Sequence, residues 1–341
     1  MEPAAPSLAA KLAFLADPRS YPEGTARVEV VRTHLSCVFL TDRHAYKLKK
    51  PLRRGEVDLT TLEARRRACQ AELRLNRRLA GEVYQAVVPL RLRPDGGLAL
   101  GEGPGEPVEW LVRMRRLPRE RMLDALVRRG EAEAAGLERL ARRLARFYRE
   151  APREPLPGPA YRERLARELA QEAEALAAPG YALPGRLLRE TVRRLEAFLA
   201  GAGAGLLEAR MAAGRLLEGH GDLRPEHCLP EEPPVVIDCL DFSRALRLLD
   251  PADELGYLAM ECAFLGDPAT GERLLEAFWR ASRDRPPRAL VRFHQARRAL
   301  LRARLSAWHV PDAGAPEAPR WLGRALRYLE LAASLARELP A

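Results

Sequence analysis

The stretch that most constrains how this chain folds runs from residue 220 to residue 242. It holds Asp222 in a turn with a glycine, and after a second turn rich in Pro and Glu an apolar run, 235–237, leads directly to Asp238. An apolar run that follows a turn predicts a buried strand. Two carboxylates placed in this way suit phosphoryl transfer, in which one takes a proton from the attacking hydroxyl and the other holds Mg²⁺ on nucleotide phosphates. The structural alternative is a Gly turn before a core strand with charged ends.

The composition describes an ordinary globular protein. The chain has 341 residues, of which 47% are hydrophobic and 30% charged, enough for one large core or two medium ones. No apolar run approaches the length of a membrane span, and the N-terminus lacks the pattern of a signal peptide. We therefore expect a cytoplasmic protein without a membrane partner. The five scattered cysteines form no CxxC pair and are expected to be reduced core residues.

The basic charge raises a nucleic-acid alternative. The formal net charge is +10, and the basic residues are 53 Arg and four Lys. This charge is spread along predicted helices that also carry Glu, which is typical of solvated faces. Aromatic residues are only 6% of the chain, and none interleave with the basic runs as base-stacking platforms would. Nucleic-acid binding is therefore disfavoured, whereas an anionic nucleotide needs only a local basic site.

The hydrophobic period changes near Leu117 and Pro118. Before this point, short alternating runs predict strands, and two amphipathic runs predict a short helix at 7–16 and a longer one at 59–80. After it, the period is helical almost throughout. The predicted strands cover 28–33, 37–40, 45–48, 86–92, 98–101 and 108–114, and the predicted later helices cover 120–129, 132–150, 160–178, 184–200, 205–213, 251–265, 270–283, 287–307 and 318–338.

The stretch 220–242 resembles the catalytic segment of the aminoglycoside/choline phosphotransferase family, whose members are relatives of protein kinases. That segment reads His-Gly-Asp-Leu, has an Asn five residues after the Asp, and ends a strand with Ile-Asp. Residues 46–51 and 238–242 also resemble the signatures of an uncharacterised branch of this family. Some members of that branch carry a P-loop domain; no GxxxxGK[ST] occurs in this sequence, and we expect this copy to stand alone.

The resemblance implies an α+β, protein-kinase-like fold with two lobes. Residues 1–117 would form a small antiparallel β lobe with one helix, which binds the nucleotide. Residues 118–341 would form a larger, mostly helical lobe for catalysis and substrate binding. The implied activity is transfer of the γ-phosphate of ATP, or another nucleoside triphosphate, to a hydroxyl of an unidentified small molecule. A nucleotide-binding protein without transferase activity is the alternative.

Several residues of the first lobe take nucleotide-binding roles from the resemblance. Lys47 would grip the α- and β-phosphates, held by Glu72, with Glu63 as the alternative partner. Ser36 lies in the bend that would cover the phosphates, and Met114 lies where the backbone would meet the adenine. Three of the four lysines fall within 47–50, which favours a function for Lys47, while Lys49 and Lys50 are interpreted as a solvated pair.

The remaining roles fall on the catalytic stretch. Asp222 would be the base, Asp238 the Mg²⁺ ligand, and Asp241 a supporting or second-metal carboxylate. His220 would brace the loop. Asp250 followed by Pro251 predicts a helix N-cap, so a structural role is favoured over direct chemistry.

His227 departs from the family pattern because it occupies the Asn position. A neutral imidazole offers one nitrogen lone pair where the amide offers an oxygen. Mn²⁺ accepts imidazole more readily than Mg²⁺ does. Three interpretations stay open: His227 ligates a metal, with Mn²⁺ favoured; it hydrogen-bonds Asp222 or Asp238; or it is a packed loop residue.

Overall fold

The computed structural model describes residues 6–55, 57–310 and 316–340. The chain forms two compact units. The smaller one comprises the chain up to Arg119 together with Val236–Ser243, and the larger one comprises Glu120–Val235 and the chain from Arg244 onward. The segment that carries Asp238 therefore packs in the smaller unit, although it follows Asp222 by only sixteen residues.

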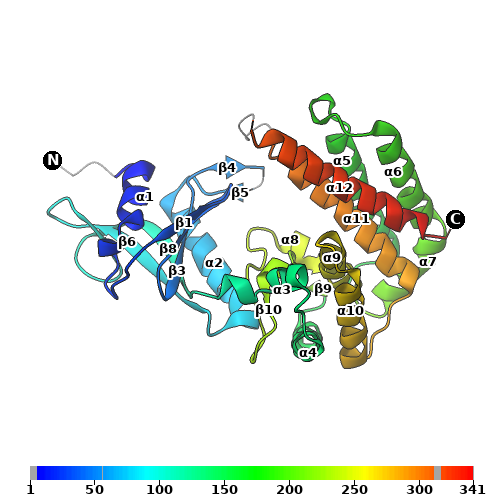
Figure 1. The fold of residues 1–341 in the computed structure, drawn as a ribbon, viewed down its shortest axis with the longest axis horizontal. Coiled ribbons are helices and arrows are strands. Elements are labelled where there is room, and N and C mark those ends of the chain that lie inside the picture. Colours follow the sequence, from blue (N-terminus) through cyan, green and yellow to red (C-terminus); the bar gives the residue numbers. More distant parts are fainter. Residues whose placement is uncertain (1–5, 56, 311–315, 341) are drawn as a thin grey trace. The chain divides into compact units, whose positions relative to one another are not determined.

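The smaller unit is built on a six-stranded antiparallel sheet with the order β1-β2-β3-β8-β6-β7. Helices α1 (Leu8–Ala16) and α2 (Leu62–Ala80) belong to this unit (Figure 1). The strands are β1 (Glu29–Arg32), β2 (Ser36–Leu40), β3 (His44–Lys49), β6 (Tyr84–Leu92), β7 (Leu98–Leu100) and β8 (Glu106–Arg115), and β4 (Arg53–Arg54) pairs with β5 (Val57–Asp58).

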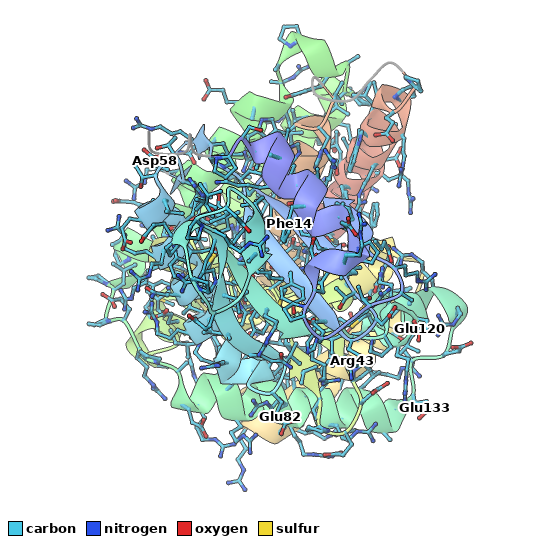
Figure 2. The ribbon with its side chains drawn as sticks, turned by 90° about the vertical axis from the view of Figure 1, so that its left-hand side faces the viewer. Phe14, Arg43, Asp58, Glu82, Glu120 and Glu133 are labelled. Carbon is cyan, nitrogen blue, oxygen red and sulfur yellow. The ribbon has the colours of Figure 1, made fainter. Side chains whose placement is uncertain are left out.

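The two faces of β3 contact different parts of the smaller unit. Tyr46 and Leu48 join an apolar core that also contains Leu15 of α1. Helix α1, with Phe14 labelled, covers that face of the sheet (Figure 2). Because successive side chains point to opposite faces of a strand, Lys47 and Lys49 both point to the other face, where α2 packs against β6 and β8.

The larger unit is predominantly helical, and within the described residues three short strands accompany its helices. Strands β9 (Leu217–Glu218) and β12 (Leu248–Leu249) pair with each other. The third is β10 (Cys228–Leu229), and the unit boundary falls within β11 (Val235–Val236). The helices are α3 (Leu123–Arg129), α4 (Ala134–Glu150), α5 (Gly158–Leu176), α6 (Gly185–Ala200), α7 (Ala202–Ala212), α8 (Arg244–Arg247), α9 (Pro251–Phe264), α10 (Pro268–Ser282), α11 (Arg288–Ala307) and α12 (Ala318–Arg337).

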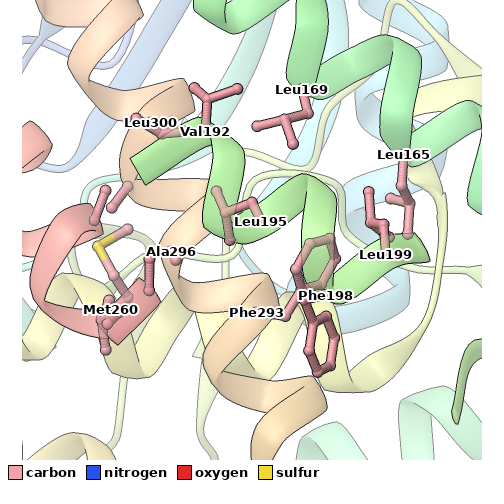
Figure 3. Packing of buried hydrophobic residues seen from close by; sticks show 14 of the residues in the cluster. Leu165, Leu169, Val192, Leu195, Phe198, Leu199, Met260, Phe293, Ala296 and Leu300 are labelled. Carbon is pink, nitrogen blue, oxygen red and sulfur yellow. The ribbon is translucent and has the colours of Figure 1, made fainter. Parts of the chain in front are cut away.

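Helix α11 lies at the centre of this unit and is buried along most of its length. It packs against α5, α9 and α12. Phe293 of α11 stacks on Phe198 of α6 with ring centroids 5.2 Å apart, in a core that includes Leu165, Leu195 and Met260 (Figure 3). A helix that is enclosed in this way needs partners for the charges it carries inward.

The predicted fold class is confirmed: an antiparallel sheet with few helices is joined to a helical unit. The strand expected at 235–237 is shorter than predicted, because β11 ends at Val236. Among the described residues, no helix is long and apolar enough to cross a membrane.

Candidate active site

Lys47 is the centre of the ionic cluster of the smaller unit. Its Nζ lies 2.9 Å from Oε1 of Glu72 and 2.7 Å from Oδ1 of Asp238. Glu72 is buried on α2, whereas the side chain of Asp238 is 45% exposed. The lysine therefore has one buried partner and one partner that solvent reaches. Glu63, the alternative partner, is exposed and pairs with Arg66.

Lys49 is buried, so its interpretation as a solvated residue was wrong. Its Nζ lies 2.8 Å from Oε2 of Glu72 and donates to Asp241. The physical reason is the period of the strand: Lys49 is two residues after Lys47 and must point to the same face. The result is a row of alternating charge, which runs Asp238, Lys47, Glu72, Lys49, Asp241.

The pKa values show that this row holds its charged states. Burial alone would lower the pKa of Lys47, but Asp238 and Glu72 together raise it well above the ordinary value. Burial likewise opposes the charge of Lys49, and Glu72 and Asp241 raise the pKa of this lysine too. For Glu72, burial raises the pKa, and the two lysines overcome that effect and lower it. Both lysines are therefore cations and Glu72 an anion at neutral pH.

The backbone of Asp238 adopts a left-handed conformation, with φ at +62°. This region is costly for residues other than Gly, and Asn and Asp tolerate it best. Two buried side chains hold the segment: Tyr84 Oη accepts from the Asp238 N–H at 3.1 Å, and Asn76 Oδ1 accepts from the Cys239 N–H at 2.8 Å. Asn76 and Tyr84 therefore fix the direction of the Asp238 carboxylate.

In the larger unit, the loop that carries Asp222 is held by Glu254. This buried α9 carboxylate accepts from the backbone N–H groups of His220, at 2.9 Å, and Gly221, and from the Tyr148 hydroxyl. Burial raises the pKa of Glu254, and these three donors oppose that rise. Sequence reasoning missed Glu254, because its contact with the loop spans more than thirty residues.

The Asp222 side chain is 28% exposed. A guanidinium group and a hydroxyl group contact the same one of its two oxygens. Arg224 Nε lies 3.0 Å from Oδ1, and Tyr257 Oη donates to the same oxygen at 3.3 Å. Burial would lower the pKa of Arg224, but Asp222 and Glu226 raise it. The carboxylate is thus oriented by fixed donors while part of it stays open to solvent.

His227 is buried, and both of its ring nitrogens have partners. Nδ1 lies 2.9 Å from the backbone oxygen of Asp222, and Nε2 lies 3.1 Å from Arg224 Nη2. Since a carbonyl oxygen only accepts and a guanidinium only donates, Nδ1 carries the proton and Nε2 accepts. Ligation of a metal by Nε2 would require it to release Arg224. The metal-ligand role remains a prediction.

The other predicted site residues have defined places. Ser36 is buried at the start of β2, where it is the register partner of Lys49, and Met114 lies near the end of β8. His220 is fully buried. Asp250 caps α9 by accepting from the Ala252 N–H and also pairs with Arg210.

Within the ranges that the structure describes, no group of three or more His, Cys, Asp or Glu side chains could hold an ion. Mg²⁺ in nucleotide sites commonly uses only one or two carboxylates, together with phosphates and water. The half-exposed Asp238 carboxylate, with hard oxygen donors, fits that kind of site.

No protein-family model matches the sequence. Uncharacterised proteins of Mycobacterium bovis and of two strains of Mycobacterium tuberculosis are each 32% identical over an alignment of 301 residues, and the match covers 85% of this chain and 57% of theirs. The chain thus spans little more than half the length of the curated relatives it matches.

Solved structures with a similar fold include choline and ethanolamine kinases. A choline/ethanolamine kinase family protein from Mesorhizobium loti has a TM-score of 0.54 at 17% identity and covers 96% of this chain and 99% of its own. Choline kinase from Cryptosporidium parvum has a TM-score of 0.52 at 10% identity, and the match covers 96% of this chain and 92% of the kinase. Plasmodium vivax ethanolamine kinase has a TM-score of 0.51 at 9% identity, and the match covers 90% of this chain and 82% of the kinase.

The chain therefore has the protein-kinase-like fold, and its structural neighbours include choline and ethanolamine kinases. The sequence resemblance predicted this fold.

Proposed function

We propose that this protein transfers the γ-phosphate of ATP, or of another nucleoside triphosphate, to a hydroxyl of a small molecule. The observation that carries the proposal is Lys47, placed between the buried Glu72 and the half-exposed Asp238. A strand lysine paired with a helix glutamate, beside an Asp that can hold a metal, is the nucleotide-binding arrangement of kinases. The fold of the small-molecule kinases supports the same conclusion.

Lys47 and Lys49 have different roles in the proposed nucleotide site. Lys47 exchanges Asp238 for the nucleotide phosphates while it stays paired with Glu72. Because Lys49 also pairs with Glu72, this buried carboxylate keeps a second cationic partner. Asp238 would hold Mg²⁺, with Asp241 in support; the bound ion would neutralise charge on the phosphates. His227 as a further ligand, with Mn²⁺ then favoured, belongs to this proposal. The five cysteines are buried and none forms a disulfide in the described structure, which is compatible with the cytoplasmic setting that we propose.

Asp222 accepts the proton of the attacking hydroxyl. Its carboxylate is partly exposed, and Glu254 fixes its loop through two backbone N–H groups. Arg224 and Tyr257 both contact Oδ1.

One observation favours the second candidate, a nucleotide-binding protein without transferase activity. His227 stands in the Asn position, and its ring nitrogens are already engaged by Asp222 and Arg224. On this alternative, ATP binds and no phosphate moves.

The test compares wild type with Asp222→Asn. We expect wild type to release ADP in the presence of ATP, Mg²⁺ and a set of hydroxylated acceptors. The variant should bind ATP equally well in a thermal-shift titration and turn over about 10²–10⁴-fold more slowly. ATP binding without turnover in wild type would favour the second candidate. If wild type does not bind ATP, both candidate functions are wrong, and nucleic-acid binding becomes the alternative to test.

A further inference from the structure

Arg302 of α11 has a nearly buried guanidinium group, whose central carbon lies 5.4 Å from the centre of the Tyr328 ring. Its Nε lies 2.7 Å from Oε1 of Glu261 and 3.4 Å from the Tyr328 hydroxyl. Within the described residues, Nη1 and Nη2 make no hydrogen bond, and neither atom is fully shielded from solvent. The side chain as a whole is only 11% exposed, so the two Nη groups form a fixed fork at the end of a buried stem.

Two side chains of helix α9 link Asp222 and Arg302. Tyr257, which donates to Asp222 Oδ1, and Glu261, which binds Arg302, are four residues apart on α9. Side chains with this spacing are neighbours on one helix face, with Cβ atoms about 5–6 Å apart. Burial would lower the pKa of Arg302, but Tyr257, Glu261, Tyr328 and Asp222 raise it, which agrees with a guanidinium that lies close to the Asp222 carboxylate.

The acidic side chains around the fork are already engaged. Glu261 accepts from Tyr328 at both oxygens, at 3.1 and 2.8 Å, as well as pairing with Arg302. Glu226 pairs with Arg224. Asp222 is reserved for the reacting hydroxyl under the proposed function. The donors left for a ligand are therefore the two Nη groups, whose planar geometry matches a carboxylate or phosphate in a bidentate manner.

We propose that the acceptor carries an anionic group, a carboxylate or a phosphate, which Arg302 binds beside the hydroxyl that Asp222 deprotonates. This inference rests on the proposed function and names the substrate class of the same site. Arg302 is then a specificity-determining residue. The net charge of +10 favours approach of such an acceptor. The choline and ethanolamine of the structural neighbours are cations, so their acceptor class does not carry over to this chain.

The test uses acceptors that differ only in charge. D-Gluconate, D-glucitol and D-glucamine share a polyol chain and end in a carboxylate, a hydroxyl and an ammonium; glycerol 3-phosphate and glycerol form a second set. Their binding to the full chain is measured by calorimetry without ATP. We expect an anionic member to bind at least about tenfold more tightly than its neutral and cationic counterparts, as charged hydrogen bonds allow.

Two variants and a control assign the preference to Arg302. Arg302→Met should remove it, and Arg302→Lys, which keeps the charge for Glu261 but lacks the fork, should reduce it while preserving the fold. Arg304→Met is the matched control: Arg304 lies on the same helix, pairs with Glu172, and its loss should leave the preference intact.

The inference is wrong if a neutral or cationic member binds more tightly than the anion, if the preference persists in both Arg302 variants, or if neither anion binds. Because these measurements contain no ATP, failure of phosphate transfer leaves their outcome unaffected. Conversely, ATP-dependent turnover that prefers a cationic acceptor would support the proposed function and reject the anionic class.

Discussion

Lys49 and Glu72 form a buried ion pair, with Nζ 2.8 Å from Oε2, while the other oxygen of the same carboxylate takes Lys47. Such sharing is uncommon because each buried charge must recover its lost hydration from its partners. Here the second lysine leaves Glu72 paired whether or not Lys47 stays with it. The contact between Lys47 and Asp238 at the exposed end of the cluster can therefore break while Glu72 keeps a cationic partner.

Lys49→Met tests this division of work. The change leaves Asp241 without its lysine and Glu72 with Lys47 alone. We expect the free energy of unfolding to fall on the order of 3 kcal/mol, as breaking a buried pair does, and ATP affinity to fall because Lys47 is retained by Glu72. Urea unfolding and ATP titration measure the two effects. Lys50→Met, at the neighbouring lysine that contacts the Thr33 backbone, should change neither by much; equal effects of the two variants would reject the special role of Lys49.

Asp238→Asn should remove the metal-dependent part of nucleotide binding. Asn tolerates the left-handed backbone at φ +62°, so the fold should persist while the charged ligand is lost. ATP affinity is measured across a Mg²⁺ titration. Wild type should bind more tightly as Mg²⁺ rises, and the variant should respond weakly. Identical Mg²⁺ responses would show that Asp238 is not the metal ligand.

The sequence predicted the fold through local patterns. Strand alternation before Leu117 and helical period after Pro118 are properties of neighbouring residues, and they survive in the structure. The same alternation rule, applied to Lys49, would have put it beside Lys47. The single Asn of the chain, Asn76, also carried a signal, since in so Asn-poor a sequence a surviving Asn marks a specific hydrogen-bonding need.

Contacts between distant segments were not predictable in this way. Glu254 binds the backbone of the 220–221 loop, and no spacing rule links a helix carboxylate to a particular loop. The fork of Arg302 depends on Glu261 taking Nε and leaving the two Nη groups. In an Arg-rich chain, nothing local separates this arginine from the others on α11.

His294 predicts how stability depends on pH. It is fully buried, and burial lowers its pKa to about 4 despite the attraction of Asp253. Arg297 and Arg298 reinforce the lowering, and Asp250 opposes it. The unfolded chain takes up a proton near pH 6.5 and the folded chain only near pH 4, so stability falls as the pH falls through this window. At about 1.4 kcal/mol for each pKa unit, the loss reaches up to about 3 kcal/mol.

The measurement is urea unfolding between pH 4 and 7 for wild type and His294→Gln. The variant should lose most of the slope between pH 6.5 and 4. His309→Gln, in the same unit, should retain it. A slope that is unchanged in His294→Gln would mean that another group is responsible.

His227→Asn decides between the roles open to this residue. In the structure, Nε2 accepts from Arg224 and Nδ1 donates to the Asp222 backbone. If Nε2 exchanges Arg224 for a metal, wild type should prefer Mn²⁺, because imidazole is a better ligand for it than for Mg²⁺. The variant should then shift toward Mg²⁺, because the amide supplies a hard oxygen. If His227 only holds the loop, the Asn side chain loses one of the two contacts, and turnover should fall equally with both metals. ATP affinity and turnover in Mg²⁺ and Mn²⁺ distinguish these outcomes: a change in metal preference supports ligation, and a uniform loss rejects it.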